Sequence, residues 1–112
     1  MALEAALAVD DTAESVIFEF TVQNGGDREV ELTFPSGKLA DVTVLDEGET
    51  VWRWSDDRLF TQAIETAMLA PGESFTERFT WDDSVPGEYE ARATLAAQGV
   101  DAAATQPFSV SG

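Results

Sequence analysis

The sequence predicts an all-β protein, an antiparallel β-sandwich of eight or nine strands. Apolar residues recur along most of the chain at every second position, which is the period of a strand with one buried face. Clusters of Gly, Pro, Asn and Asp separate these runs at short intervals, as turns do. The chain has 112 residues, of which 44% are hydrophobic, so a single domain covering residues 1–112 is expected.

Four alternating runs occupy the first part of the chain. Residues 3–9 alternate Leu, Ala, Leu and Val with other residues, and residues 16–22 place Val, Phe, Phe and Val on one face. Residues 30–34 alternate Val, Leu and Phe with Glu and Thr, and residues 42–44 continue the pattern. The turns expected between them, at residues 24–27 and 35–37, contain the residue types that reverse a chain.

Four more runs follow in the second part. Residues 50–54 come after an acidic turn at 46–49, and residues 75–81 carry Phe, Glu, Phe and Trp on one face. Residues 89–97 alternate Tyr, Ala, Ala, Leu and Ala with polar residues, and residues 108–110 end the last run. Turns are expected at residues 71–72, 85–87 and 98–99.

The segment from residue 59 to residue 68 fits two periods. Alternation selects Phe60, Gln62 and Ile64, whereas helical spacing selects Leu59, Ala63 and Ala67. The β-branched Thr61 and Thr66 and the neighbouring strands favour a strand, and a short helix remains the alternative.

Negative charge dominates the composition. Six basic and 22 acidic residues give a formal net charge of −16, and the acids are spread along a chain that also carries 10% aromatic residues. This composition indicates an acidic coat on a folded surface rather than a disordered tail. Repulsion on this scale is relieved in concentrated salt, so we expect a halophilic protein; an acidic surface for a basic partner is the alternative. Nucleic acid is not an expected partner, because phosphates would be repelled.

The absence of two residue types excludes several classes of functional site. The chain contains no Cys and no His, which excludes disulfides, thiolate or imidazole metal sites and triads that use either residue. No apolar run is long enough for a membrane span, and residues 1–9 hold an acidic residue and no basic one, unlike a signal peptide. We therefore expect a soluble cytoplasmic protein with no enzymatic activity, no cofactor and no membrane partner, with a monomer favoured.

Other polar and aromatic groups have alternative interpretations. Trp52 and Trp54 lie on one face of the expected strand, either as core packing or, together with Trp81 and Phe60, as a surface for a sugar or a protein. The pairs at residues 10–11, 56–57 and 82–83 are adjacent aspartates that could bind Ca²⁺, but no ordered calcium loop surrounds them. Paired carboxylates could also hydrolyse a glycoside, yet nothing in a short sandwich implies a deep cleft.

One stretch of sequence resembles a known family. The run Thr50-Val51-Trp52-Arg53-Trp54-Ser55 is followed by Phe60-Thr61-Gln62-Ala63, by Leu69-Ala70-Pro71-Gly72-Glu73 and then by Trp81. This order is similar to that of the intracellular proteinase inhibitor (BsuPI) domain family. The resemblance is collinear over about nine-tenths of the chain. It implies an immunoglobulin-like β-sandwich that inhibits an intracellular serine protease. The motif residues Trp52, Arg53, Trp54, Phe60, Gln62, Pro71, Gly72 and Trp81 are interpreted as structural.

Two functions remain open from the sequence. The first is a cytoplasmic proteinase inhibitor that binds an intracellular serine protease through loops or an edge strand. The second is a non-inhibitory interaction or structural sandwich domain of a halophile.

A tight inhibitor needs a rigid exposed segment, because ordering a mobile loop on binding costs affinity. The segment that fits best is formed by Ser55, Asp56, Asp57, Arg58 and Leu59, with Trp54 and Phe60 as anchors at its two ends. Leu59 or Arg58 would enter a specificity pocket of the protease, and the aspartates would favour a basic rim.

Overall fold

A computed structural model describes residues 3–12, 15–82, 84–100 and 102–110 of the chain. It contains nine strands and one short 3₁₀ helix within these residues, so the all-β prediction is confirmed. The elements are β1 (Leu3–Asp11), β2 (Val16–Asn24), β3 (Val30–Phe34), β4 (Ala40–Asp46), β5 (Glu49–Arg53), η1 (Trp54–Asp57), β6 (Glu65–Leu69), β7 (Ser74–Trp81), β8 (Gly87–Leu95) and β9 (Ala103–Val110). No helix in the described residues is long and apolar enough to cross a membrane.

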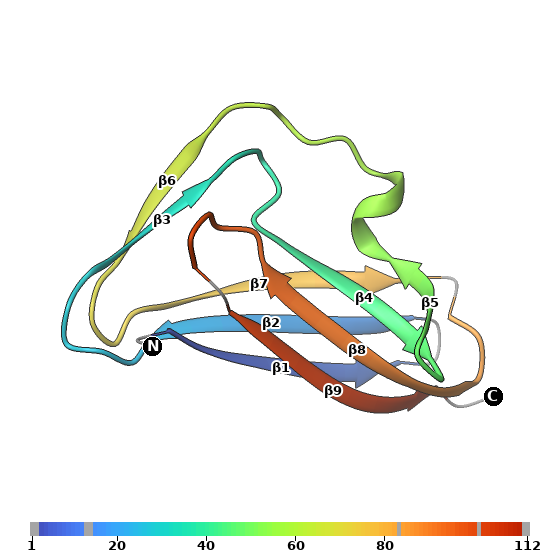
Figure 1. Cartoon of the computed structure of the whole chain (residues 1–112). Coiled ribbons are helices and arrows are strands. Elements are labelled where there is room, and N and C mark those ends of the chain that lie inside the picture. Colours follow the sequence, from blue (N-terminus) through green and yellow to red (C-terminus); the bar gives the residue numbers. More distant parts are fainter. Residues whose placement is uncertain (1–2, 13–14, 83, 101, 111–112) are drawn as a thin grey trace.

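The strands form an antiparallel sandwich with one additional strand pair. One layer has the strand order β1-β2-β7 and the other has the order β5-β4-β8-β9, while β3 pairs with β6 alone. Figure 1 shows the two larger sheets lying over one another, with the β3–β6 pair leaning away from them at one end. The edge strands β1 and β9 lie side by side and close one flank of the sandwich (Figure 1).

The core lies between the two larger sheets and follows the alternation of the sequence. Phe18, Phe20 and Phe79 are fully buried, and Ala91 and Ala93 on β8 leave room for these rings. The Trp52 ring on β5 stacks between Phe18 at 6.0 Å and Trp81 at 5.8 Å. β5 and β7 are edge strands of different sheets, so the stacked rings join the two sheets along the flank opposite β1 and β9.

The tight turn between β4 and β5 also follows from its residues. Glu47 has φ 51° and Gly48 has φ 86°, both in the left-handed region. Two consecutive left-handed residues are typical of the hairpin turn whose twist matches the flanking strands. Glycine at the second position therefore suits the short connection between these two strands.

The expectation for residues 59–68 was only partly correct. A strand forms at β6, but residues 58–64 have no regular secondary structure. The single helical turn lies earlier, at η1, and takes Trp54 out of the strand that the alternation predicted. Residues 58–64, which are exposed apart from the half-buried Phe60, have no neighbouring strand to complete their backbone hydrogen bonds, so β-propensity alone does not make them a strand.

The ion pairs of the described residues leave most of the acidic charge unpaired. Four pairs are present, and all involve at least partly exposed side chains. In the shortest pair, Glu19 accepts a hydrogen bond of 2.9 Å from Arg78, and this bond and the opposite charge raise the pKa of Arg78. Exposed pairs of this kind contribute little to stability.

Candidate functional site

A long exposed segment connects β5 to β6, and we call residues 54–64 the arch. It begins with η1 and continues through residues 58–64 across the top of the view in Figure 1 to β6. The arch contains the whole loop that the sequence suggested as a protein contact, from Ser55 to Leu59.

The first turn of the arch is held by a carboxylate from another strand. Asp41 on β4 accepts hydrogen bonds from the Ser55 backbone nitrogen at 3.2 Å and from Ser55 Oγ at 2.6 Å. The Arg58 nitrogen then donates to the Ser55 carbonyl oxygen at 3.3 Å, which closes the helical turn. Ser55 therefore faces inward. The sequence does not point to Asp41, because Asp41 and Ser55 are 14 residues apart in the chain.

The two expected anchors of the loop lie in contact. The ring centroids of Trp54 and Phe60 are 5.6 Å apart, and Trp54 also packs edge-on against Phe79 of β7 at 4.8 Å. Trp54 thus connects the arch to the core. Aromatic pairs at these separations are favourable beyond the area that they bury.

A second tether follows Phe60. The Gly37 nitrogen, in the connection between β3 and β4, donates to the Thr61 carbonyl oxygen at 2.9 Å. A Cβ at residue 37 would lie 2.7 Å from Thr61 Oγ1, so the close approach requires glycine. The arch is therefore held at Ser55, Phe60 and Thr61.

Between these tethers the arch presents one apolar side chain to solvent. Leu59 has a relative exposure of 101%, and Ile64 near the end of the arch is 72% exposed. Arg58 has an extended backbone, with φ −126° and ψ 147°. Its guanidinium lies 4.5 Å from the centre of the Trp54 ring, and its Nε donates to the Trp54 carbonyl oxygen at 3.2 Å.

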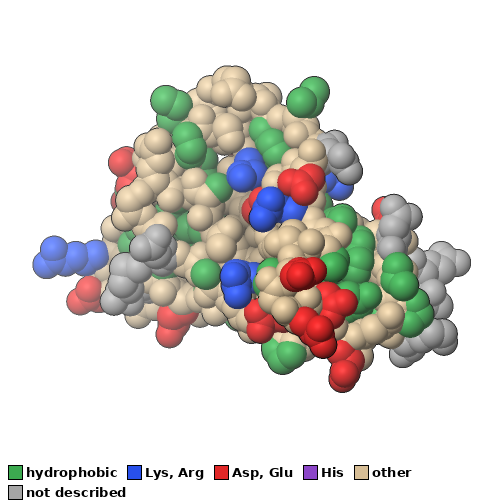
Figure 2. All heavy atoms as spheres, turned by 45° about the vertical axis from the view of Figure 1, so that its right-hand side comes forward, with side chains coloured by type: hydrophobic (Ala, Val, Ile, Leu, Met, Phe, Trp, Pro, Cys, Tyr) green, Lys and Arg blue, Asp and Glu red, His purple; other side chains and the backbone are tan. Residues whose placement is uncertain are grey.

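A polar hollow of about 360 Å³ lies beside the arch. Its lining residues are Trp52, Arg53, Trp54, Arg58, Thr80, Trp81 and Asp82. Arg53 pairs with Asp56 at 3.7 Å, whereas Arg58 makes no ion pair with any described residue. Figure 2 brings this side forward and shows basic side chains near the middle of the face, with acidic side chains gathered below them.

The remaining motif residues are divided between core and surface. Trp52 and Trp54 are half-buried and pack on the core, while Val51 and Arg53 between and beside them are exposed, as the expected alternation requires. Trp81 is buried. At the surface, Gln62 is exposed and Pro71 and Gly72 form the turn before β7, where Gly72 has φ 80°.

The paired aspartates form no metal centre in the part of the chain that is described. These residues hold no group of three or more acidic side chains that could bind a metal ion. Asp83 lies outside the described residues, and so does the side chain of Asp57.

Comparison with known proteins links this geometry to a family. Residues 3–100 match the sequence model of the family described as BsuPI, intracellular proteinase inhibitor. No curated protein matches the chain.

Solved structures share the fold. The CARDB domain of a Pyrococcus furiosus protein, solved by NMR, is 22% identical with a TM-score of 0.55, and the match covers 98% of this chain and 94% of that one. A crystal structure of the same domain in complex with di-metal ions is 23% identical over 96% of this chain and 86% of that one, also with a TM-score of 0.55.

A larger protein carries the fold as a small part. β-Glucosidase 3B from Thermotoga neapolitana is 20% identical with a TM-score of 0.54, and the match covers 98% of this chain and 16% of the enzyme. At these identities the solved structures support the fold alone.

Proposed function

Because the chain belongs to the BsuPI family of intracellular proteinase inhibitors, we propose that it is a cytoplasmic inhibitor of an intracellular serine protease. The partner in this proposal is a protein, bound by a monomer of this chain through the arch. The inhibitor itself needs no cofactor, because it acts by occupying the substrate cleft.

The observation that carries the proposal is the full exposure of Leu59 between two tethers. Trp54 and Ser55 hold the segment before Leu59, and Phe60 and Thr61 hold it after Leu59. A segment held before binding loses little conformational freedom when a protease closes around it, so more of the contact energy remains as affinity. This chain achieves that without the disulfides that small secreted inhibitors use.

Leu59 is the better candidate of the two side chains for a protease pocket. The Arg58 guanidinium is occupied by the Trp54 ring and carbonyl, whereas the Leu59 side chain is wholly solvated. Burial of a leucine side chain in an apolar pocket is worth about 2 kcal/mol. The exposed Asp56, together with the net charge of −16, favours a protease with a basic rim.

The test is inhibition of a subtilisin-like intracellular protease from a halophile, measured in concentrated KCl. Leu59→Ala should weaken inhibition at least tenfold, about 1.4 kcal/mol, and Arg58→Ala should weaken it by a similar factor. Val85→Ala is the matched control, because it removes an exposed apolar side chain from a different loop. Unchanged inhibition by both arch variants, with the fold intact, would exclude the arch as the contact and leave the edge strands.

A second candidate is a non-inhibitory interaction or structural domain. The observation that favours it is the occurrence of this fold as a small part of a large enzyme, 16% of the Thermotoga β-glucosidase. Pull-down from the source cytoplasm at high salt separates the candidates. Capture of a serine protease supports the inhibitor, and capture of other proteins with no effect on protease activity supports the second candidate.

A further inference from the structure

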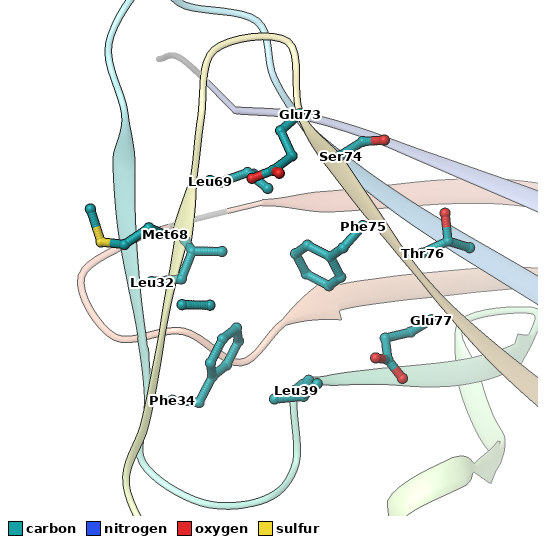
Figure 3. Close-up of a pocket in the computed structure, with 11 residues that line it drawn as sticks. Leu32, Phe34, Leu39, Met68, Leu69, Glu73, Ser74, Phe75, Thr76 and Glu77 are labelled. Atoms are coloured by element: carbon teal, nitrogen blue, oxygen red, sulfur yellow. The ribbon is translucent and has the colours of Figure 1, made fainter.

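A wedge-shaped groove separates two strands that follow one another in the chain. β6 and β7 are joined by a short turn, yet β6 pairs only with β3 and β7 pairs only with β2. Between them lies a hollow of about 400 Å³, lined by residues of β3, β6 and β7 and by Leu39. Figure 3 shows the strands diverging from the turn, with side chains of both walls pointing into the space between them.

The apex of the wedge is fastened by a buried side chain. Asn24, at the end of β2, is fully buried and donates through Nδ2 to the carbonyl oxygen of Leu69 at 2.9 Å. Its backbone nitrogen donates to the Glu73 carbonyl oxygen at 2.9 Å, and its carbonyl oxygen accepts from the Gly72 nitrogen at 2.8 Å. One residue thus binds both the end of β6 and the start of β7, which fixes the position from which the strands diverge.

The walls of the wedge are mainly apolar. Phe75 from β7, Phe34 from β3 and Leu39 face the hollow in Figure 3. Met68 on β6 is 48% exposed, and Figure 3 shows its side chain directed away from Phe75 and the space between the strands. An apolar side chain from another protein would remove these walls from water, which is favourable in proportion to the area covered.

A carboxylate at the rim has no partner among the described residues. Glu77 on β7 is half-buried, and Figure 3 shows its side chain directed into the groove toward Leu39. No hydrogen bond or ion pair joins Glu77 to any described residue, whereas Glu73 near the apex already accepts from the Ala70 nitrogen at 3.0 Å. A partner with both a Lys or Arg and an apolar side chain would pair with the Glu77 carboxylate and cover the apolar walls of the groove.

One edge of β7 is also unpaired. Among the described residues β7 pairs with β2 alone, so its other edge keeps free backbone donors and acceptors, and residues 73–77 line the hollow. Extended peptides bind such edges as an additional strand, with side-chain pockets supplying the specificity.

We propose that the wedge between β6 and β7 binds an extended segment of a partner protein in which a large apolar side chain stands two residues from a Lys or Arg, so that both point to the same face. The apolar side chain enters the hollow, the basic group pairs with Glu77, and the backbone adds to the free edge of β7. This site is separate from the arch, and it does not depend on the partner being a protease.

The test uses backbone amide NMR of the labelled protein in about 1 M KCl, where non-specific charge attraction is screened. The probe is a short capped peptide that repeats Phe-Ser-Lys-Ser, which places phenylalanine and lysine on one face of an extended chain. Its controls replace the phenylalanines with serine or the lysines with glutamate. We expect saturable shifts at the amides of β6 and β7 with the first peptide, and at least tenfold weaker binding by either control peptide.

Two variants of the groove and one control variant examine the contacts. Glu77→Gln should weaken binding about fivefold by removing the charge at constant size, and Glu88→Gln, an exposed glutamate on β8, should bind as the unaltered protein does. Ala67→Trp, an exposed residue that lines the groove, should weaken binding at least tenfold by filling the hollow. Shifts confined to other strands, or equal binding by the unaltered protein, Glu77→Gln and Ala67→Trp, would overturn the proposal.

Discussion

Trp54 and Phe60 bring their ring centroids to 5.6 Å at the two ends of the segment that carries Leu59. The two rings lie on either side of the fully exposed Leu59 in the sequence, and Trp54 also packs against Phe79 of the core. Rigidity of the arch therefore depends on a half-buried ring, Phe60, that belongs to no strand or helix.

Removal of that ring should make the arch accessible to proteolysis. An aromatic pair is worth about 1 kcal/mol, so in Phe60→Ala trypsin should cleave after Arg58 about fivefold faster than in the unaltered protein. Ile64→Ala is the control, because it shortens an exposed side chain in the same arch. Equal cleavage rates for Phe60→Ala and Ile64→Ala would show that the ring contact does not restrain the segment. The rates are read from the time course of the fragment cut after Arg58.

Asn24→Ala should be among the most destabilising substitutions of a polar residue in this chain. It would leave the carbonyl oxygens of Arg28 and Leu69 and the Gly26 nitrogen without their side-chain partner. Loss of one buried and two partly buried hydrogen bonds should lower the free energy of unfolding by about 3 kcal/mol.

Chemical denaturation at a constant high KCl concentration measures the effect of Asn24→Ala. Gln23→Ala is the matched control, since Gln23 is the exposed neighbour and its side chain makes a single 3.5 Å bond to the Gly72 carbonyl oxygen. It should change the free energy of unfolding by no more than about 0.5 kcal/mol. The prediction is wrong if the two variants unfold at the same denaturant concentration.

Salt should stabilise this protein strongly. The chain has only six basic residues against 22 acidic ones. Three of the four ion pairs of the described residues join exposed side chains and therefore contribute little to stability. Between about 0.1 M and 2 M KCl the screening length falls from about 10 Å to a few Å, so the melting temperature should rise steeply.

A charge variant separates screening from other effects of salt. Glu49→Lys combined with Glu88→Lys, both at exposed positions, lowers the net negative charge and should make the melting temperature less dependent on KCl. A melting temperature that does not change with KCl would contradict the halophilic interpretation of the composition. Scanning calorimetry of both proteins across the salt series provides the comparison.

Local alternation is enough to predict most of the strands and the faces that they bury. Alternation at residues 16–22, 30–34 and 75–81 predicts β2, β3 and the face of β7 that carries Phe79 and Trp81, because a strand with one buried face must repeat every second residue. The sequence also suggests Trp54 and Phe60 as anchors at the two ends of an exposed segment, but the contact between the two rings is a feature of the tertiary structure.

Strand pairing and the tethers of the arch depend on contacts across the whole fold. Asp41 binds Ser55 and Gly37 binds Thr61 through contacts between residues distant in the chain, which no local pattern encodes. The same is true of the wedge. Alternation predicts the apolar face of Phe75, but before β7 it selects the face that ends at Met68, which is exposed, whereas Leu69 is buried. β6 pairs with β3 rather than with β7, and that choice of partner leaves the groove open. Strand pairing depends on the packing of the whole sandwich, because every strand offers the same backbone donors and acceptors to any neighbour.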